Sequence, residues 1–264
     1  MSNLAGIHVL LVPAWWPSPE QPISGVFCTD YARAFAAAGA KVGVMYPDLV
    51  SVRYLGKGTR IPWRPRLTVE DLSGVPVIRI RGLHTAFGRP ALQMHRFRRW
   101  LRWGLREYRV RYGEPDVLHA MCAIPAGWAC THLDDPLASR TVVTEHTGPF
   151  SLVLTPRAGE AYVRAALAKA AAVVAVGEPL RREMSAAGVR DEIAVCGNPV
   201  AGSFTGQPVP GAGEGGAGAL TGSPTGALIA QPVPCAPREG RSVRAIFVGR
   251  LVAEKGLREL VQAA

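Results

Sequence analysis

The chain has 264 residues, of which 48% are hydrophobic and 19% are charged. This composition excludes an intrinsically disordered chain, and the length suffices for one large α/β domain or two small ones. The sequence contains no run near the roughly 20 apolar residues of a membrane span, and residues 1–12 lack the basic flank of a signal peptide, so we expect a soluble, cytoplasmic protein.

The first elements along the chain form a predicted βαβ unit. Residues 7–12 are a short apolar run that ends at Pro13, which is typical of a buried strand in a parallel sheet. A proline-rich loop follows, and then a predicted helix at 26–38 and a second strand at 41–46. A strand, a long loop, a helix and a strand in this order are the crossover that joins two parallel strands.

Positive charge is concentrated in the next region. The formal net charge is +10, and residues 53–111 hold 15 Lys or Arg against three Asp or Glu. Inside this region a predicted helix at 94–112 carries apolar side chains at helical spacing, namely Phe97, Leu101, Leu105 and Tyr108. Either residues 53–111 contact an anionic membrane surface, or the apolar stripe packs on its own domain and the arginines are solvated. No nucleic-acid reader motif accompanies the charge, so we expect no nucleic-acid partner.

Strands and helices alternate through the rest of the first 200 residues. Residues 50–89 alternate weakly, with the best strand at 75–80. Further strands are predicted at 115–119, 141–144, 172–176 and 193–195, and helices at 126–133, 158–171 and 179–187. This alternation predicts an α/β fold with a doubly wound parallel sheet.

The composition changes abruptly at Ala201. Residues 201–242 are rich in Gly, Pro, Ala, Ser and Thr, which is typical of a flexible linker or insertion. A strand is predicted again at 243–248, followed by a turn and a helix up to Ala264. We therefore expect a domain at 1–200, a linker at 201–242 and the start of a second α/β domain at 243–264.

Three groups of residues are candidates for binding or chemistry. Gly25 precedes a helix near the carboxyl end of the first strand, where open α/β sheets bind ligands, although it also fits an ordinary turn. Glu145 and His146 follow a strand and could bind sugar hydroxyls, shuttle a proton or only make structural hydrogen bonds. His119 is a lesser candidate at another predicted strand end.

The third group is the more specific one. Gly249 and Arg250 directly follow the strand predicted at 243–248, and Lys255 stands five residues after Arg250, just before a helix. Two cations at a helix N-terminus suit a diphosphate, although an ordinary strand-to-helix turn could also hold them. The five cysteines show no metal-ligand spacing, so we expect reduced thiols and no metal site.

Residues 248–256, which read VGRLVAEKG, resemble the signature that opens the donor domain of retaining GT-B glycosyltransferases of the large group-1, family 4-like, superfamily. Other segments resemble the N-terminal domain of that family and occur in the same order, namely 17–30, 34–46, 115–119, 144–146, 172–177 and 197–200. The resemblance covers nearly the whole chain outside residues 50–110 and 201–242.

The resemblance implies a hexosyltransferase-like enzyme that moves a sugar from a nucleotide-diphosphate-sugar donor to a glycolipid or polysaccharide, with retention of configuration. It implies a Rossmann-like acceptor-side domain and the first β-turn-α of a second Rossmann-like domain. The nucleotide sugar is then a substrate, and no cofactor is needed. By position, His146 and Glu145 are the candidate catalytic residues, Gly25 and His119 lie on the acceptor side, and Gly249, Arg250 and Lys255 hold the donor diphosphate.

Two departures from the family pattern open an alternative. The E-x7-E segment of the family does not occur before Ala264, and Met121 stands where members often carry a second histidine after His119. We therefore expect a truncated enzyme, and a non-catalytic module that binds an acceptor or a membrane surface is the alternative. A nucleotide-binding oxidoreductase is disfavoured because the first turn lacks the GxGxxG fingerprint.

Overall fold

The structure, a computed structural model, describes residues 4–54, 61–84, 89–199, 233–234 and 244–245. These residues belong to two compact units, Met1–Gly211 and Ala212–Ala264. In the first unit an eight-stranded sheet has the order β3-β4-β2-β1-β5-β6-β7-β8. The strands are β1 His8–Pro13, β2 Lys41–Ser51, β3 Arg66–Leu72, β4 Val75–His84, β5 Val117–Met121, β6 Thr141–Glu145, β7 Ala172–Ala175 and β8 Ala194–Val195.

Every strand pair in this sheet is parallel except β3 and β4, which form an antiparallel pair at one edge. The helices are α1 Val26–Ala37, α2 Pro90–Tyr112, α3 Trp128–Thr131, α4 Glu160–Lys169 and α5 Glu178–Ala186. Short helical turns occur at Val52–Tyr54, Ala123–Gly127, Pro136–Arg140 and Phe150–Leu152. The doubly wound parallel sheet predicted from the sequence is confirmed.

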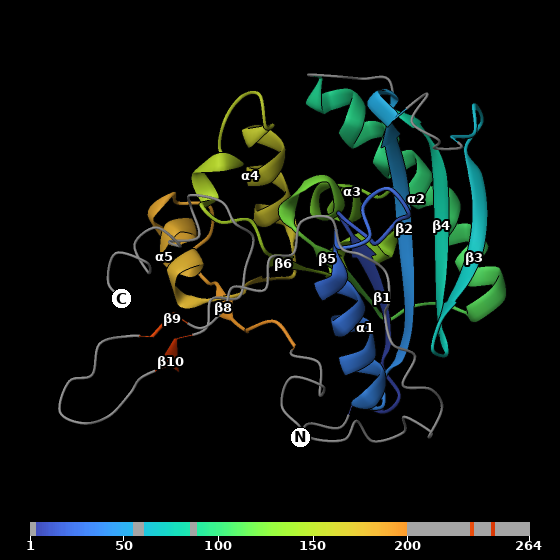
Figure 1. Ribbon diagram of the computed structural model, residues 1–264, viewed down its shortest axis with the longest axis horizontal. Coiled ribbons are helices and arrows are strands. Elements are labelled where there is room, and N and C mark those ends of the chain that lie inside the picture. The colour runs from blue at the N-terminus through green and yellow to red at the C-terminus, as the bar shows by residue number, and fades with distance from the viewer. Residues whose placement is uncertain (1–3, 55–60, 85–88, 200–232, 235–243, 246–264) are drawn as a thin grey trace. The chain divides into compact units, whose positions relative to one another are not determined.

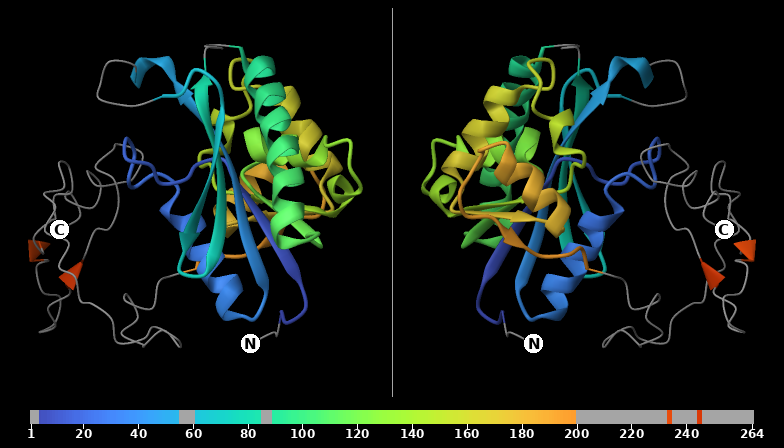
Figure 2. Two further views of the ribbon diagram at one scale, coloured as in Figure 1. Left: turned by 90° about the vertical axis from the view of Figure 1, so that its right-hand side faces the viewer. Right: turned by 90° about the vertical axis from the view of Figure 1, so that its left-hand side faces the viewer.

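Both faces of the sheet are covered, as Figures 1 and 2 show for α1 on one face and α2 on the other. Strand β1 explains why two covers are needed, because all six of its residues are buried. Val9 and Leu11 belong to the core under α1, whereas Leu10 and Val12 belong to the core shared with α2, α3 and α4. A parallel strand buried on both sides reads as a continuous apolar run, which is why residues 7–12 were recognisable in the sequence.

Helix α2 packs its apolar stripe against the sheet. Each side chain of the stripe is at most 1% exposed, and the stripe consists of Phe97, Leu101, Leu105 and Tyr108. Gly104 lets the helix approach closely, since a Cβ there would lie 2.3 Å from Sδ of Met45 in β2. The packing interpretation of the stripe is therefore confirmed, and these apolar side chains are not available to a membrane.

Several predicted elements differ from the structure. Strand β2 continues to Ser51, five residues beyond its predicted end, and β5 continues to Met121, so that His119 lies inside the strand. The helix predicted at 126–133 is replaced by the turn Ala123–Gly127 and the short helix α3. Strand β3 was not predicted, because it is an edge strand with no buried residue and its apolar alternation is weak.

In the second unit the structure describes two short strands. β9 Val233–Pro234 and β10 Arg244–Ala245 pair antiparallel. β9 falls inside the segment predicted to be a linker, and β10 inside the strand predicted at 243–248. Gly249, Arg250 and Lys255 lie outside the described residues, so the predicted diphosphate site and the predicted domain limits stay predictions.

Candidate functional site

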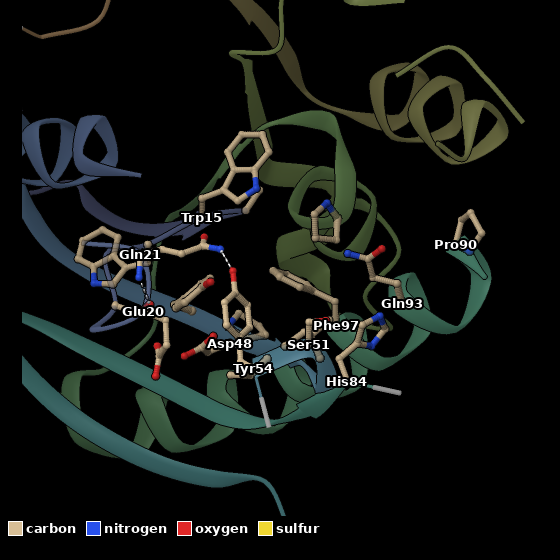
Figure 3. Close-up of a pocket in the computed structure, with 18 of the residues that line it drawn as sticks. Trp15, Glu20, Gln21, Asp48, Ser51, Tyr54, His84, Pro90, Gln93 and Phe97 are labelled. Carbon is tan, nitrogen blue, oxygen red and sulfur yellow. Dashed lines mark hydrogen bonds between the residues drawn. The ribbon is translucent and has the colours of Figure 1, made fainter. Parts of the chain in front are cut away.

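A polar cavity of about 510 Å³ opens at the carboxyl ends of β1, β2 and β4, beside the first turn of α2 (Figure 3). Strand β1 lies between β2 and β5. The strands that follow β1 up to β4 lie on one side of it, and β5 to β8 lie on the other side, so the strand order reverses at β1. Ligands of open α/β sheets bind outside the carboxyl ends of the strands at such a reversal. Its polar lining includes Ser18, Glu20, Gln21, Asp48, Ser51, Tyr54, His84, Arg89, Gln93 and Arg157.

Two arginines of β4 fix one wall of this cavity. Arg79 and Arg81 donate to the carboxylate of Asp48 at 3.2 and 2.7 Å. Arg81 also donates to Glu20 at 2.6 Å, and Arg79 donates to the carbonyl of Pro17 at 2.9 Å. The loop after β1 is therefore tied to β4 by charge-assisted hydrogen bonds that are largely buried.

The charge of Glu20 follows from the same contacts. Burial by itself raises the pKa of Glu20, but the hydrogen bond from Arg81 and other hydrogen bonds lower it further, and the net pKa is below the ordinary value. Glu20 is therefore ionised near neutral pH, and Arg81 neutralises it. Because Glu20 and Asp48 are already paired, they order the wall and leave ligand binding to other groups.

Those other groups come from three separate segments. The indole of Trp15 is 41% exposed after β1, and the amide of Gln93 projects from the first turns of α2 (Figure 3). Arg89 and Arg157 line the cavity and form no ion pair with a carboxylate in the described part of the chain. An aromatic ring suits an apolar face of a ligand, and amides and cations suit its hydroxyl or acidic groups. The arrangement therefore fits a ligand that combines an apolar face with many such groups.

Gly25 acts on this cavity indirectly. It precedes α1 with a φ of 73°, and a Cβ there would lie 2.2 Å from the carbonyl oxygen of Trp15. The backbone that Gly25 admits is thus the protein's own, at the residue that carries the exposed indole. Gly25 does not line the cavity itself.

Glu145 is almost fully buried at the end of β6, at 1% exposure. One carboxylate oxygen accepts from the amides of His146 and Thr147 at 2.9 and 2.7 Å, and the other accepts from the amide of Ala123 at 2.8 Å. The side chain therefore joins the end of β6 to the segment after β5. Both oxygens are occupied by backbone groups, so the first role of Glu145 is to order this edge of the sheet.

His119 and His146 meet at the ring of Tyr31 in α1, each with ring centroids 5.8 Å from it. Nε2 of His119 lies 2.7 Å from Oγ1 of Thr144. His146 packs on Phe27 at 4.4 Å, and its ring nitrogens and the Tyr31 hydroxyl are buried with no hydrogen-bond partner in the described part of the protein. A buried polar atom without a partner is unfavourable, so a water molecule or a ligand group that reached these atoms would be stabilised by a hydrogen bond.

Burial determines the protonation of both imidazoles. Desolvation lowers the pKa of His119 to about 4, and it lowers the pKa of His146 to about 4 with a smaller contribution from His119. Both rings are therefore neutral near pH 7. A neutral imidazole can donate and accept one hydrogen bond each, but with so low a pKa it is a weak general base.

The candidates predicted from the sequence are thus only partly brought together. His119, Glu145 and His146 lie around the carboxyl end of β6, and none of them lines the 510 Å³ cavity. The cavity residues, of which Trp15, Asp48 and Gln93 are examples, were not predicted from the sequence. A signal for Trp15 was present, since a Trp-Trp pair directly follows the first buried strand.

A doubly wound sheet with a polar cavity at the carboxyl ends of its strands defines a Rossmann-like domain with a candidate site for a polar ligand. The model of Glycosyltransferase Family 4 matches residues 24–201, more than half of the sequence, and the chain belongs to that family.

Among solved structures, the chain is similar to an α,α-trehalose-phosphate synthase (UDP-forming) from Burkholderia xenovorans in complex with glucose-6-phosphate. The identity is 16% and the TM-score is 0.43, over 67% of this chain and 42% of that one, so the chain spans less than half the length of the synthase. No curated protein matches the sequence.

Proposed function

We propose that the protein transfers a hexose from a nucleotide-diphosphate sugar to a hydroxyl group of a glycan or lipid-linked acceptor, with retention of configuration. The observation that carries the proposal is the family match over residues 24–201, in a domain with a polar cavity at the carboxyl edge of its sheet. Membership of Glycosyltransferase Family 4 favours transferase activity over the binding of a dinucleotide.

The 510 Å³ cavity is the proposed acceptor site. Trp15 offers an aromatic surface to the apolar face of a sugar ring, and Gln93 can bond to hydroxyl groups. Arg89 and Arg157 add two positive charges that the described carboxylates leave unpaired, which favours an acceptor with a phosphate or carboxylate group. A glycolipid or an acidic polysaccharide has this chemistry.

His146 is proposed to bond to a sugar hydroxyl at the carboxyl end of β6. Its unpartnered ring nitrogens support this role, and its low pKa disfavours proton shuttling near pH 7. Glu145 and His119 are then positioning residues, because the first fixes the backbone of His146 and the second packs beside it against Tyr31. Gly25 supports the acceptor side through Trp15.

Gly249, Arg250 and Lys255 are proposed to hold the donor diphosphate. Arg offers a planar fork and Lys a point charge, and both would stabilise the negative charge that develops on the leaving diphosphate without a metal ion. This part of the proposal rests on the resemblance of residues 248–256 to the family signature.

Calorimetric titration of the full chain with a panel of nucleotide-diphosphate sugars tests the donor role. We expect binding that is lost in Arg250→Ala/Lys255→Ala, either in the chain alone or with the part of a family member's donor domain that follows this signature supplied as a separate chain. The Arg89→Ala/Arg157→Ala variant should bind the donor normally and transfer less sugar to acidic acceptors. If no nucleotide sugar binds under either condition, the proposal is wrong.

We also propose that the protein works in the cytoplasm, at the inner face of the membrane, in the synthesis of a glycolipid or polysaccharide. None of the described helices combines the length and apolar character needed to cross a bilayer, so contact would be peripheral, through residues 53–111. A non-catalytic module that binds an acceptor or a membrane is the second candidate, and the exposed arginines of α2 favour it. Such a module would bind vesicles or acceptor and transfer no sugar.

A further inference from the structure

A second groove, of about 630 Å³, lies between α2 and the β3-β4 edge of the sheet, and it shares no lining residue with the polar cavity. Its charged lining consists of Arg96, Arg99, Arg102 and Arg106, which recur every three or four residues and so share one face of the helix. Trp63 and Trp103 lie beside them. We call these six residues the arginine groove, and its lining includes no acidic residue.

The charges of the arginine groove are poorly neutralised. Arg99 and Arg106 form no ion pair with a carboxylate in the ranges that the structure describes. Arg102 approaches Asp134 at 3.7 Å, but the two side chains are 60% and 75% exposed, so water screens this pair. Arg96 donates to the carbonyl of Leu83 at 3.1 Å and remains cationic. Like charges one helical turn apart repel, so an anionic partner would relieve them.

Two arginines near the C-terminal end of the same helix provide a contrast. Arg109 binds Asp135 at 2.7 Å and Glu114 at 2.5 Å, and Arg111 binds Glu107 at 2.6 Å. Carboxylates therefore pair with arginines in the last turn of α2, whereas the lining of the groove includes none.

An exposed aromatic side chain accompanies these charges. Trp63 is 85% exposed, the most exposed of the large aromatic side chains described, and it lines the groove with half-buried Trp103. Indole rings favour the boundary between water and lipid, where one side of the ring is apolar and the N–H stays hydrated. Arginine with tryptophan is the composition of surfaces that lie on anionic bilayers.

We propose that the arginine groove docks on a bilayer containing anionic phospholipids, with Trp63 entering the headgroup region. The inference rests on the proposed membrane contact and names its surface and its lipid chemistry. It also reverses the orientation expected of an amphipathic helix. The apolar stripe of α2 faces the sheet, so the helix meets the membrane with its arginine face.

Vesicle sedimentation of the full chain tests the inference. Vesicles of phosphatidylcholine with about a third phosphatidylglycerol are compared with pure phosphatidylcholine, at low and high salt. The test variant is Arg99→Glu/Arg106→Glu. Its matched control is Arg33→Glu/Arg182→Glu, which changes the net charge equally at exposed sites on α1 and α5.

We expect binding only to the anionic vesicles, weakening with salt, and a loss of about tenfold or more in Arg99→Glu/Arg106→Glu but not in the control. Trp63→Ala should weaken binding without changing its salt dependence. Circular dichroism must show that each variant is folded.

Three results would overturn the inference. These are equal binding to neutral vesicles, an equal loss in the control variant, and a preference for RNA over anionic vesicles. Calorimetry with nucleotide sugars on the same samples separates this inference from the proposed function. If sugar-nucleotide binding persists without vesicle binding, only the docking surface is wrong, and the opposite result contradicts the transferase proposal alone.

Discussion

The carboxylate of Glu145 binds the backbone next to Cys122, a residue whose backbone conformation is unfavourable. Cys122, directly after β5, has φ 84° and ψ 148°, a region that is nearly restricted to glycine and costs about 1–3 kcal/mol. Its amide donates to the carbonyl of Thr144 at 2.7 Å, and the next amide, of Ala123, donates to Glu145. These two hydrogen bonds fix the conformation at the edge of the sheet where the His146 loop begins.

Removal of the Glu145 carboxylate should therefore destabilise the fold. Glu145→Ala leaves three amide groups without their acceptor, and we expect a loss of about 3 kcal/mol in the free energy of unfolding. Urea denaturation measures it. Glu160→Ala is the control, because Glu160 makes a partly exposed pair with Arg164 one helical turn away and should cost less than about 0.5 kcal/mol. Equal effects of the two substitutions would contradict the structural role of Glu145.

The buried imidazole of His119 predicts a pH dependence of stability. Its pKa of about 4 in the folded protein lies below the value of about 6.5 in an unfolded chain. As the pH falls through 6.5, the unfolded state takes up a proton that the folded state does not, so stability is full above this pH and is lost progressively down to about pH 4. His119 alone should cost about 2 kcal/mol between about pH 7.5 and pH 5.

Unfolding in urea across this pH range checks the prediction. His119→Gln keeps a polar contact with Thr144 but does not titrate, so the loss at about pH 5 should shrink by about 2 kcal/mol relative to the unsubstituted protein. His146 shifts in the same direction and leaves a remaining slope in the variant. A variant with an unchanged slope would show that His119 does not contribute.

At the scale of elements, the buried strands could be predicted from the sequence, because the side chains of a buried strand show in its local composition. Strand β1 was recognisable because its residues are buried on both sides and read as an apolar run, and β6 because its first four residues, Thr141 to Thr144, are all β-branched. Strand β3 was not predicted because none of its side chains is buried and its exposed and half-buried residues follow no regular alternation, so tertiary pairing with β4 decides its structure. The same holds for the cavity. Its lining comes from the loop after β1, the end of β2, and α2, and only the topology brings these segments together.

The start of α1 is an element whose geometry depends on one glycine. Gly25→Ala must accept a φ of 73° and also place a Cβ 2.2 Å from the carbonyl oxygen of Trp15. Gly6→Ala is the control, because Gly6 has a φ of 86° but no atom within 4 Å of the added Cβ. We expect Gly6→Ala to cost about 1 kcal/mol and Gly25→Ala clearly more, with altered emission from Trp15 and Trp16. Thermal unfolding measures the two losses of stability. An equal decrease of the unfolding temperature in both variants would exclude the close contact.

At the scale of the whole molecule, the two units divide the proposed functions. Both core clusters lie between Leu4 and Ile193, and all eight strands of the large sheet precede Gly211. The polar cavity and the arginine groove also belong to this first unit. Gly249, Arg250 and Lys255, proposed to hold the donor, belong to the sequence of the second.

A chain that ends at Gly211 should therefore fold on its own. We expect its unfolding midpoint in urea to match that of the cavity-containing unit in the full chain, because the buried apolar contacts of that unit are all retained. Anionic vesicles should still bind it, whereas nucleotide sugars should not, since the residues proposed to hold the diphosphate are absent. A lower midpoint would show that residues 212–264 stabilise the first unit, and retained sugar-nucleotide binding would move the donor site to the described domain.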